Sequence, residues 1–101
     1  MAWNFRLPSR FTIAHFGGIT FFPDTCGKDC YLRQGVTVGA NGRGGKHPVI
    51  GNHVEFGANS IVIGEVVIGD YVKIGAGAVV VKNVPPNSVV AGVPAKVIKK
   101  F

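Results

Sequence analysis

Residues 50–80 read IGNHVEFGANSIVIGEVVIGDYVKIGAGAVV, and large apolar residues recur in this stretch at every sixth position. These residues are Ile50, Phe56, Val62, Ile68, Ile74 and Val80. A second series of small or apolar residues begins four positions later and consists of Val54, Ser60, Val66, Val72, Ala78 and Val84. A helix buries a face about every 3.6 residues and a strand every second residue, so neither forms one long element here. Repeats of six residues are typical of a parallel β-helix, which is an all-β coil of short strands.

The same spacing extends toward the N-terminus and sets the expected domain organisation. Ile13 and Ile19 are six residues apart, and the repeat resumes through Cys26 after one residue of irregularity near 23–25. Because three repeats make one coil of about 18 residues, residues 13–88 are predicted to form about four coils. Residues 1–12 show no repeat and are expected to cap the open end. Pro85-Pro86 is expected to end the coils because proline lacks an N–H, and 89–101 is expected to form a tail packing on the last coil.

Residues 39–48, Gly-Ala-Asn-Gly-Arg-Gly-Gly-Lys-His-Pro, interrupt the repeat and contain four glycines. Twelve residues separate Val38 from Ile50, which is two repeats, so the spacing alone does not tell whether this segment stays in the wall. Its glycine content favours a protruding loop. Loops that leave a regular solenoid are common places for binding and catalytic residues.

Composition restricts the class of protein. No apolar run reaches the roughly 18 residues of a membrane span and no secretory signal is visible, so we expect no membrane partner. Two cysteines, Cys26 and Cys30, are too few for a disulfide framework, and we predict a reduced cytoplasmic protein with Cys26 in the core. The net charge is +6, but the basic residues are scattered without an aromatic cluster, so nucleic acid is not the expected partner. The hydrophobic fraction of 47% predicts a covered interface.

Two of the three histidines are candidates for chemistry. His15 and His47 lie beside glycines and away from the core spacing, and a neutral imidazole readily takes a proton from a hydroxyl or amine. His53 lies in a turn between repeats and is expected to be an ordinary surface residue. Three histidines could in principle bind zinc, but nothing in their spacing makes them converge, and no metal is expected.

Five segments of the chain resemble the hexapeptide-repeat acyltransferases, and most of all the catalytic domain of serine acetyltransferases. The resemblance covers about residues 13–100. The segments are His15-Phe-Gly-Gly-Ile19, Gln34-Gly-Val-Thr-Val-Gly39, His47-Pro-Val-Ile-Gly51, Ile74-Gly-Ala-Gly-Ala-Val-Val80 and Val84-Pro-Pro-Asn-Ser-Val-Val-Ala-Gly-Val-Pro-Ala-Lys96. The resemblance implies a left-handed β-helix, a homotrimer and acetyl-CoA as the acyl donor. The acceptor would be a small hydroxyl- or amine-bearing molecule such as an amino acid or a sugar.

The resemblance also implies roles for individual residues. The histidine matching His15 is the general base of the serine enzymes, and the one matching His47 lies beside the acceptor. Related sugar acetyltransferases place the catalytic histidine in a His-Pro loop similar to His47-Pro48, so the two roles can be exchanged. CoA would run along a groove between subunits and contact Ala58 and Ala76. The phosphates of CoA would lie near Lys82 and Lys96.

Some positions depart from the pattern of the serine enzymes. Ala14 stands where they have an aspartate, Lys46 where they have an arginine, and no counterpart of their helical domain is present in these residues. These departures favour an alternative, a catalytically degenerate trimer that keeps the fold and binds CoA. The zinc-dependent carbonic anhydrases that share the fold are excluded, since their ligand histidines would fall at Ala58 and Ile63.

Overall fold

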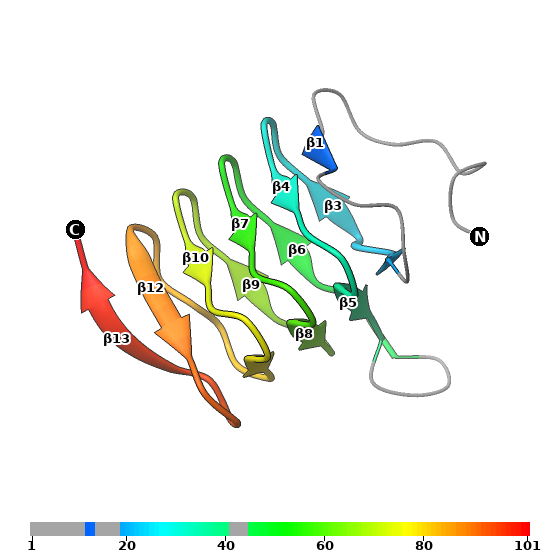
Figure 1. Cartoon of the computed structure of the whole chain (residues 1–101). Helices are drawn as coiled ribbons and strands as arrows, with labels where there is room; N and C mark the ends of the chain where they lie inside the picture. Colours follow the sequence, from blue (N-terminus) through cyan, green and yellow to red (C-terminus); the bar gives the residue numbers. More distant parts are fainter. Residues whose placement is uncertain (1–11, 14–18, 41–44) are drawn as a thin grey trace.

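The computed structural model describes residues 12–13, 19–40 and 45–101, and these form an all-β, left-handed parallel β-helix (Figure 1). The chain winds through three sheets, one per side of the coil. Sheet A contains β1 (Thr12–Ile13), β4 (Tyr31–Leu32), β7 (Glu55–Phe56), β10 (Lys73–Ile74), β12 (Ser88–Ala91) and β13 (Lys96–Lys100). Sheet B contains β2 (Thr20–Phe21), β5 (Thr37–Gly39), β8 (Ile61–Ile63) and β11 (Val79–Val80). Sheet C contains β3 (Thr25–Cys26), β6 (Val49–Ile50) and β9 (Val67–Ile68).

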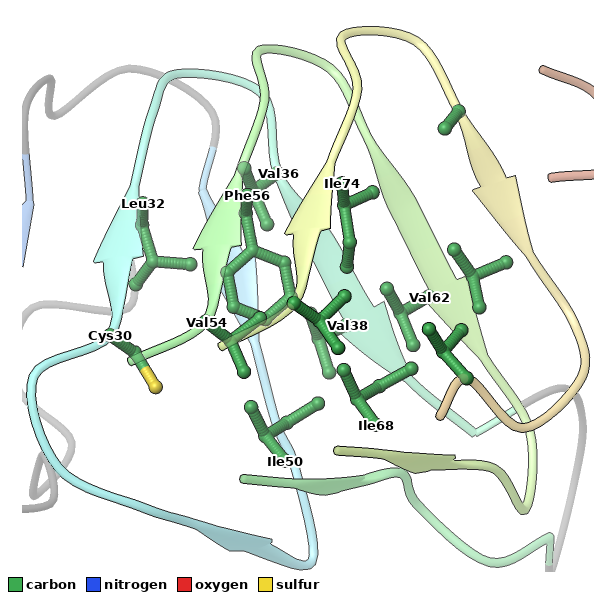
Figure 2. Close-up of a cluster of buried hydrophobic side chains, with 14 of the residues drawn as sticks. Cys30, Leu32, Val36, Val38, Ile50, Val54, Phe56, Val62, Ile68 and Ile74 are labelled. Carbon is green, nitrogen blue, oxygen red and sulfur yellow. The ribbon is translucent and has the colours of Figure 1, made fainter. Parts of the chain in front are cut away.

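The core consists of apolar columns that run along the axis of the coil (Figure 2). Each predicted repeat position stacks on its counterpart in the next coil, for example Phe56 on Ile74 and Val62 on Val80. The members of both sequence series between Val54 and Val84 are buried. Parallel stacking in register explains why a six-residue repeat is sufficient to form one continuous core.

The first described coil departs from the expected repeat in two ways. Phe21, not Ile19, stacks on Val38 in sheet B, so eight positions separate Ile13 from Phe21 and five separate Phe21 from Cys26, where the regular repeat has six. Cys26 stacks on Ile50 as predicted but is only partly buried, because β3 is the edge strand of sheet C. Cys30, which lies outside the first series, is the fully buried cysteine.

The glycine-rich loop is an insertion at the corner between sheets B and C. Val38 pairs with Val62 and Ile50 pairs with Ile68, yet twelve positions separate Val38 from Ile50 along the chain and only six separate their partners Val62 and Ile68. The strands on both sides therefore stay in register while the corner holds six additional residues. Residues 41–44 at the centre of the loop lie outside the described residues, as do residues 1–11 of the expected cap.

The parallel wall continues past Pro85 and Pro86, contrary to the expectation that they end it. Val84 bridges to Ile68, and β12 pairs in parallel with β10. The prolines lie at a corner, where a missing N–H costs no ladder hydrogen bond. β13 then folds back antiparallel on β12 and covers the edge of sheet A (Figure 1). The expected boundary between 88 and 89 thus falls inside β12.

Glycine at the corner after β7 is required by close packing between coils. A Cβ on Gly57 would lie 2.5 Å from the Ala76 nitrogen and 2.7 Å from the Ile74 carbonyl oxygen, which are backbone atoms. We expect Gly57→Ala to destabilise the fold by about 1–3 kcal/mol, because two coils must separate. Gly39→Ala is the matched control, since a Cβ there meets no atom within 4 Å. Urea unfolding of both variants checks this; equal midpoints would contradict the packing seen here.

Ser60 is the polar member of the second buried series. Its hydroxyl is buried and makes no hydrogen bond to a described residue. Removing an unpaired buried hydroxyl relieves its desolvation penalty, so Ser60→Ala is expected to stabilise the protein by about 1 kcal/mol. A lower unfolding midpoint in urea would show that the hydroxyl has a partner after all.

Candidate functional site

His47 is held at the base of the glycine-rich loop by a hydrogen bond to the preceding coil. Its Nδ1 lies 2.7 Å from the carbonyl oxygen of Phe22, which follows β2. A carbonyl accepts only, so Nδ1–H donates this bond. The neutral ring therefore carries its proton on Nδ1 and keeps Nε2 unprotonated. The His47 side chain is exposed, and the hydrogen bond to Phe22 makes Nε2 the ring nitrogen that can accept a hydrogen bond.

The backbone directly after His47 is tied to the wall. Asp24 N–H donates to the Pro48 carbonyl at 2.7 Å, and β6 begins immediately after this proline. The residue before a proline is restricted to extended backbone, which further limits the histidine. His47 is thus a loop residue with two hydrogen bonds to the preceding coil at or next to it.

A pocket of about 410 Å³ opens beside His47. Its apolar part comes from sheet C and the corner before β9, and its polar part comes from the loop and neighbouring corners. The lining residues are Asp24, Lys46, His47, Val49, Glu65, Val66 and Val67. Lys46 pairs with Glu65 at 3.5 Å, and both side chains are largely exposed, so the pair adds little stability. The pocket combines a potential base with charges of both signs, which suits a small polar acceptor.

Of the other two histidines, only His53 belongs to the described residues, and it does not line this pocket. His15 lies outside the described residues, so its predicted role stays a prediction. His53 lies at the corner between sheets C and A, where it stacks on Tyr71 at 4.8 Å and lies 3.8 Å from an Asp29 carboxylate oxygen. This exposed position agrees with the expectation of an ordinary surface residue. Among the residues that the structure describes, no three histidine, cysteine or acidic side chains form a metal-binding group.

The predicted CoA contacts Ala58 and Ala76 lie next to each other at the corner between sheets A and B. Gly77 N–H donates to the Ala58 carbonyl at 2.9 Å. This hydrogen bond joins the corner that contains Ala76 to the corner that contains Ala58 in the neighbouring coil. Lys96 lies on the same side, because Ala95 N–H donates to the Val79 carbonyl at 2.8 Å. Small side chains along this corner leave the backbone accessible to a ligand.

Lys82 lies on the opposite side of sheet B, where its strands end and the chain turns toward sheet C. We refer to the two rows of corners at which its strands begin and end as the two edges of sheet B. His47 is in the same row of corners, two coils earlier. The structure therefore divides the predicted site residues between two edges of one sheet. Between these edges, the outer face of sheet B is largely apolar, with alternate side chains pointing away from the core. These side chains belong to Thr37, Ile61, Ile63, Val79 and Val81, and none is fully buried.

Asp24 and Glu65 are pocket residues that the sequence analysis did not identify. Each occupies a corner of a different coil, and the two are 41 positions apart along the chain. Their relation to His47 depends on the register between coils and on the insertion before β6. Only the acidic character of both residues could have been noticed beforehand.

No helix of the described structure is long and apolar enough to cross a membrane.

Comparison with protein families gives one match. Residues 47–82 match the model of the family described as "Bacterial transferase hexapeptide (six repeats)". This segment includes His47, the corner glycine Gly57 and Lys82. The matched residues cover β6 to β11 and so most of the regular part of the wall.

Among curated proteins, the chain is 51% identical over 74 residues to a serine acetyltransferase of Mycobacterium tuberculosis, covering 71% of this chain and 32% of that protein. It is 37% identical over 99 residues to a serine acetyltransferase of Staphylococcus aureus, covering 94% and 46%. The chain therefore spans less than half the length of each of these relatives.

Solved structures show the same likeness. The serine acetyltransferase of Neisseria gonorrhoeae superposes with a TM-score of 0.82 at 41% identity, covering 87% of this chain and 36% of that one. A Brucella abortus serine acetyltransferase in complex with coenzyme A gives a TM-score of 0.81 at 34% identity, covering 90% and 38%. The repeat, the left-handed coil and these matches lead to one conclusion: residues 47–82 carry the hexapeptide repeat of the bacterial transferases, and the curated proteins and solved structures that the chain resembles are serine acetyltransferases.

Proposed function

We propose that this protein is an acetyl-CoA-dependent O- or N-acetyltransferase that works as a homotrimer in the cytoplasm. The observation that supports it most is His47, whose hydrogen bond to Phe22 leaves an unprotonated Nε2 beside a pocket lined by apolar and charged side chains. The similarity to serine acetyltransferases, one of them solved with coenzyme A, supports the acyl donor. An amino acid or sugar of small size is the proposed acceptor class.

In the proposed reaction, a histidine removes the proton of the acceptor hydroxyl or amine. The freed oxygen or nitrogen attacks the thioester carbonyl carbon, and backbone N–H groups stabilise the oxyanion that forms. The intermediate expels the CoA thiolate, which recovers the proton from the imidazolium. We assign the base to His15 and the orientation of the acceptor to His47. The hydrogen bond to Phe22 supports the second assignment, since it lets Nε2 accept a hydrogen bond from the acceptor.

The two edges of sheet B support the proposed trimer. Ala58, Ala76 and Lys96 lie along one edge, and Lys82 lies along the other with His47. If copies pack through the apolar outer face of sheet B, one edge of a copy can approach the other edge of its neighbour. CoA would then lie between subunits, with the lysines beside its phosphates. An interface of this kind also covers the exposed Val81.

An acetyl-transfer assay tests the proposal. Purified protein is incubated with acetyl-CoA and a panel of amino acids, hydroxyl sugars and amino sugars, and released CoA is quantified by chromatography. We expect CoA release above the acceptor-free rate with at least one small acceptor. Release at the acceptor-free rate with every acceptor, together with saturable CoA binding, would instead support the second candidate.

The second candidate is a degenerate trimer that binds CoA without transferring the acetyl group. It is favoured by Ala14 and Lys46, which replace an aspartate and an arginine of the serine enzymes. Lys46 is exposed and paired with Glu65, so it keeps a positive charge at the pocket but lacks the fork of donors that arginine offers a carboxylate. Substituting Lys46→Arg distinguishes the candidates further: increased CoA release would show that the site is catalytic.

A further inference from the structure

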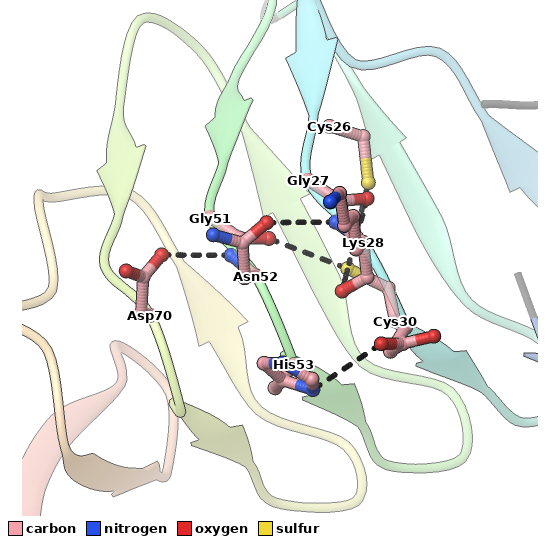
Figure 3. A network of polar contacts seen from close by, with 9 residues as sticks. Cys26, Gly27, Lys28, Cys30, Gly51, Asn52, His53 and Asp70 are labelled. Carbon is pink, nitrogen blue, oxygen red and sulfur yellow. Dashed lines mark hydrogen bonds and ion pairs between the residues drawn. The ribbon is translucent and has the colours of Figure 1, made fainter. Parts of the chain in front are cut away.

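The two cysteines form a pair at the corner between sheets C and A. Cys26 ends β3, Cys30 directly precedes β4, and their Sγ atoms are 3.5 Å apart (Figure 3). This contact is separate from the pocket beside His47, and the proposed acetyl transfer does not use it. An Sγ–Sγ bond is about 2.05 Å long, so bond formation requires an approach of about 1.5 Å.

The corner that joins the cysteines is fixed by hydrogen bonds to the next coil. Gly27 N–H donates to the Ile50 carbonyl at 2.9 Å, and Lys28 N–H donates to the Asn52 side-chain oxygen at 2.8 Å. In return, His53 N–H donates to the Lys28 carbonyl at 2.8 Å. Figure 3 shows the hydrogen bond between Lys28 and Asn52 beside the sulfur atoms. The folded chain therefore holds the two thiols together, and the unfolded chain does not.

The environments of the two thiols differ. Cys30 is fully buried with its sulfur 3.4 Å from the Gly51 carbonyl oxygen, while Cys26 is partly exposed. The hydrogen bond from Cys26 lowers the pKa of Cys30 against the opposing effect of burial, and the same bond raises the pKa of Cys26. The pair of thiols therefore loses its first proton more readily than its second, and the second proton is shared between the two sulfur atoms. A thiolate with a thiol in contact is the arrangement that thiol–disulfide exchange requires.

We propose that Cys26 and Cys30 form a reversible intramolecular disulfide by exchange with a small-molecule disulfide. Cys26 is the partly exposed sulfur, so it meets the external disulfide: its proton passes along the hydrogen bond to Cys30, and the resulting Cys26 thiolate attacks one sulfur of the external disulfide and displaces a small thiolate. Cys30 then attacks the Cys26 sulfur and displaces the second small thiolate. The two protein thiols are oxidised and the external disulfide is reduced; its S–S bond and two protein S–H bonds are lost, and one protein S–S bond and two small thiols form. Such bonds in a reducing compartment are transient and redox-sensing.

The test uses the full chain in buffers with graded ratios of oxidised to reduced glutathione, with and without urea. After acid quenching, free thiols are alkylated in denaturant and the intact mass is measured. We expect a single-chain product lighter by two hydrogens and carrying no alkyl group. Its equilibrium constant in the native state is expected to exceed that in urea by about tenfold or more. Full alkylation at every ratio, a lasting glutathione adduct, cross-linked chains, or a native constant no larger than that in urea would each overturn the proposal.

Single-cysteine variants make the product assignable. Cys26→Ser is expected to keep one alkylated thiol at every ratio. Cys30→Val retains a core residue, because the counterpart of Cys30 in the next coil is Val54, and it is expected to yield only an adduct on Cys26. Circular dichroism verifies that both variants fold. Loss of two hydrogens in either variant would show that the product does not join these two sulfurs.

Discussion

Replacing His15 by alanine is expected to lower kcat by about 10²–10⁴-fold, with acetyl-CoA binding unchanged. General-base catalysis contributes a factor of this size, because without it the acceptor must lose its proton to water. Binding of the donor is retained, since the proposed CoA contacts lie on the edges of sheet B at other residues. The measurement is CoA release at saturating acetyl-CoA, with donor affinity determined separately by calorimetry.

Two histidine variants serve as controls. His47→Ala is expected to raise the acceptor KM more than it lowers kcat, because His47 is assigned to orient the acceptor. His53→Ala is expected to change neither, since His53 is an exposed corner residue stacked on Tyr71. If His47→Ala removes kcat and His15→Ala does not, the two assignments are reversed. If neither variant changes the rate, the account of proton removal is wrong.

Replacing Phe56 by alanine is expected to lower the free energy of unfolding by about 3–5 kcal/mol. Phe56 is fully buried at the centre of the coil, and its ring meets Phe21 edge-to-face with centroids 5.8 Å apart. Leu32 and Ile74 lie on either side of it in the same sheet (Figure 2). Because neighbouring strands are locked in register, the coil cannot collapse into the cavity that the substitution leaves.

Tyr71→Ala is the control for the loss of an aromatic ring. Tyr71 is 53% exposed and contacts His53 at the surface, so its loss is expected to cost less than about 1 kcal/mol. Urea unfolding of both variants at one protomer concentration checks the difference, since assembly makes stability concentration-dependent. Similar midpoints for the two variants would contradict the assignment of Phe56 to the core.

The coil could be predicted because its signal is periodic. Ile50, Phe56 and Val62 occupy successive sheets and recur at a spacing that leaves few alternatives. The coil also shows where periodicity is insufficient. The spacing from Val38 to Ile50 fits two repeats equally well as one repeat plus six residues, and only the pairing of β6 with β9 distinguishes them.

The site could be predicted only in part. His47 was identified because a histidine beside glycines and a proline is unusual in a repeat. Its partner Phe22 and the neighbouring Asp24 belong to the preceding coil, and no feature of their own spacing relates them to it. The end of the wall was misjudged for a similar reason: whether a proline interrupts a ladder depends on its place at a corner or in a strand, as Pro86 shows.

Titration of the purified protein with acetyl-CoA in a calorimeter, with light scattering on the same sample, tests the central proposal most directly. We expect saturable binding at one site per subunit and the mass of a trimer. That result is the one that a donor site between the subunits of a trimer predicts, and it justifies the acceptor assays. No binding up to millimolar acetyl-CoA, or the mass of a monomer, would contradict the proposed acetyltransferase.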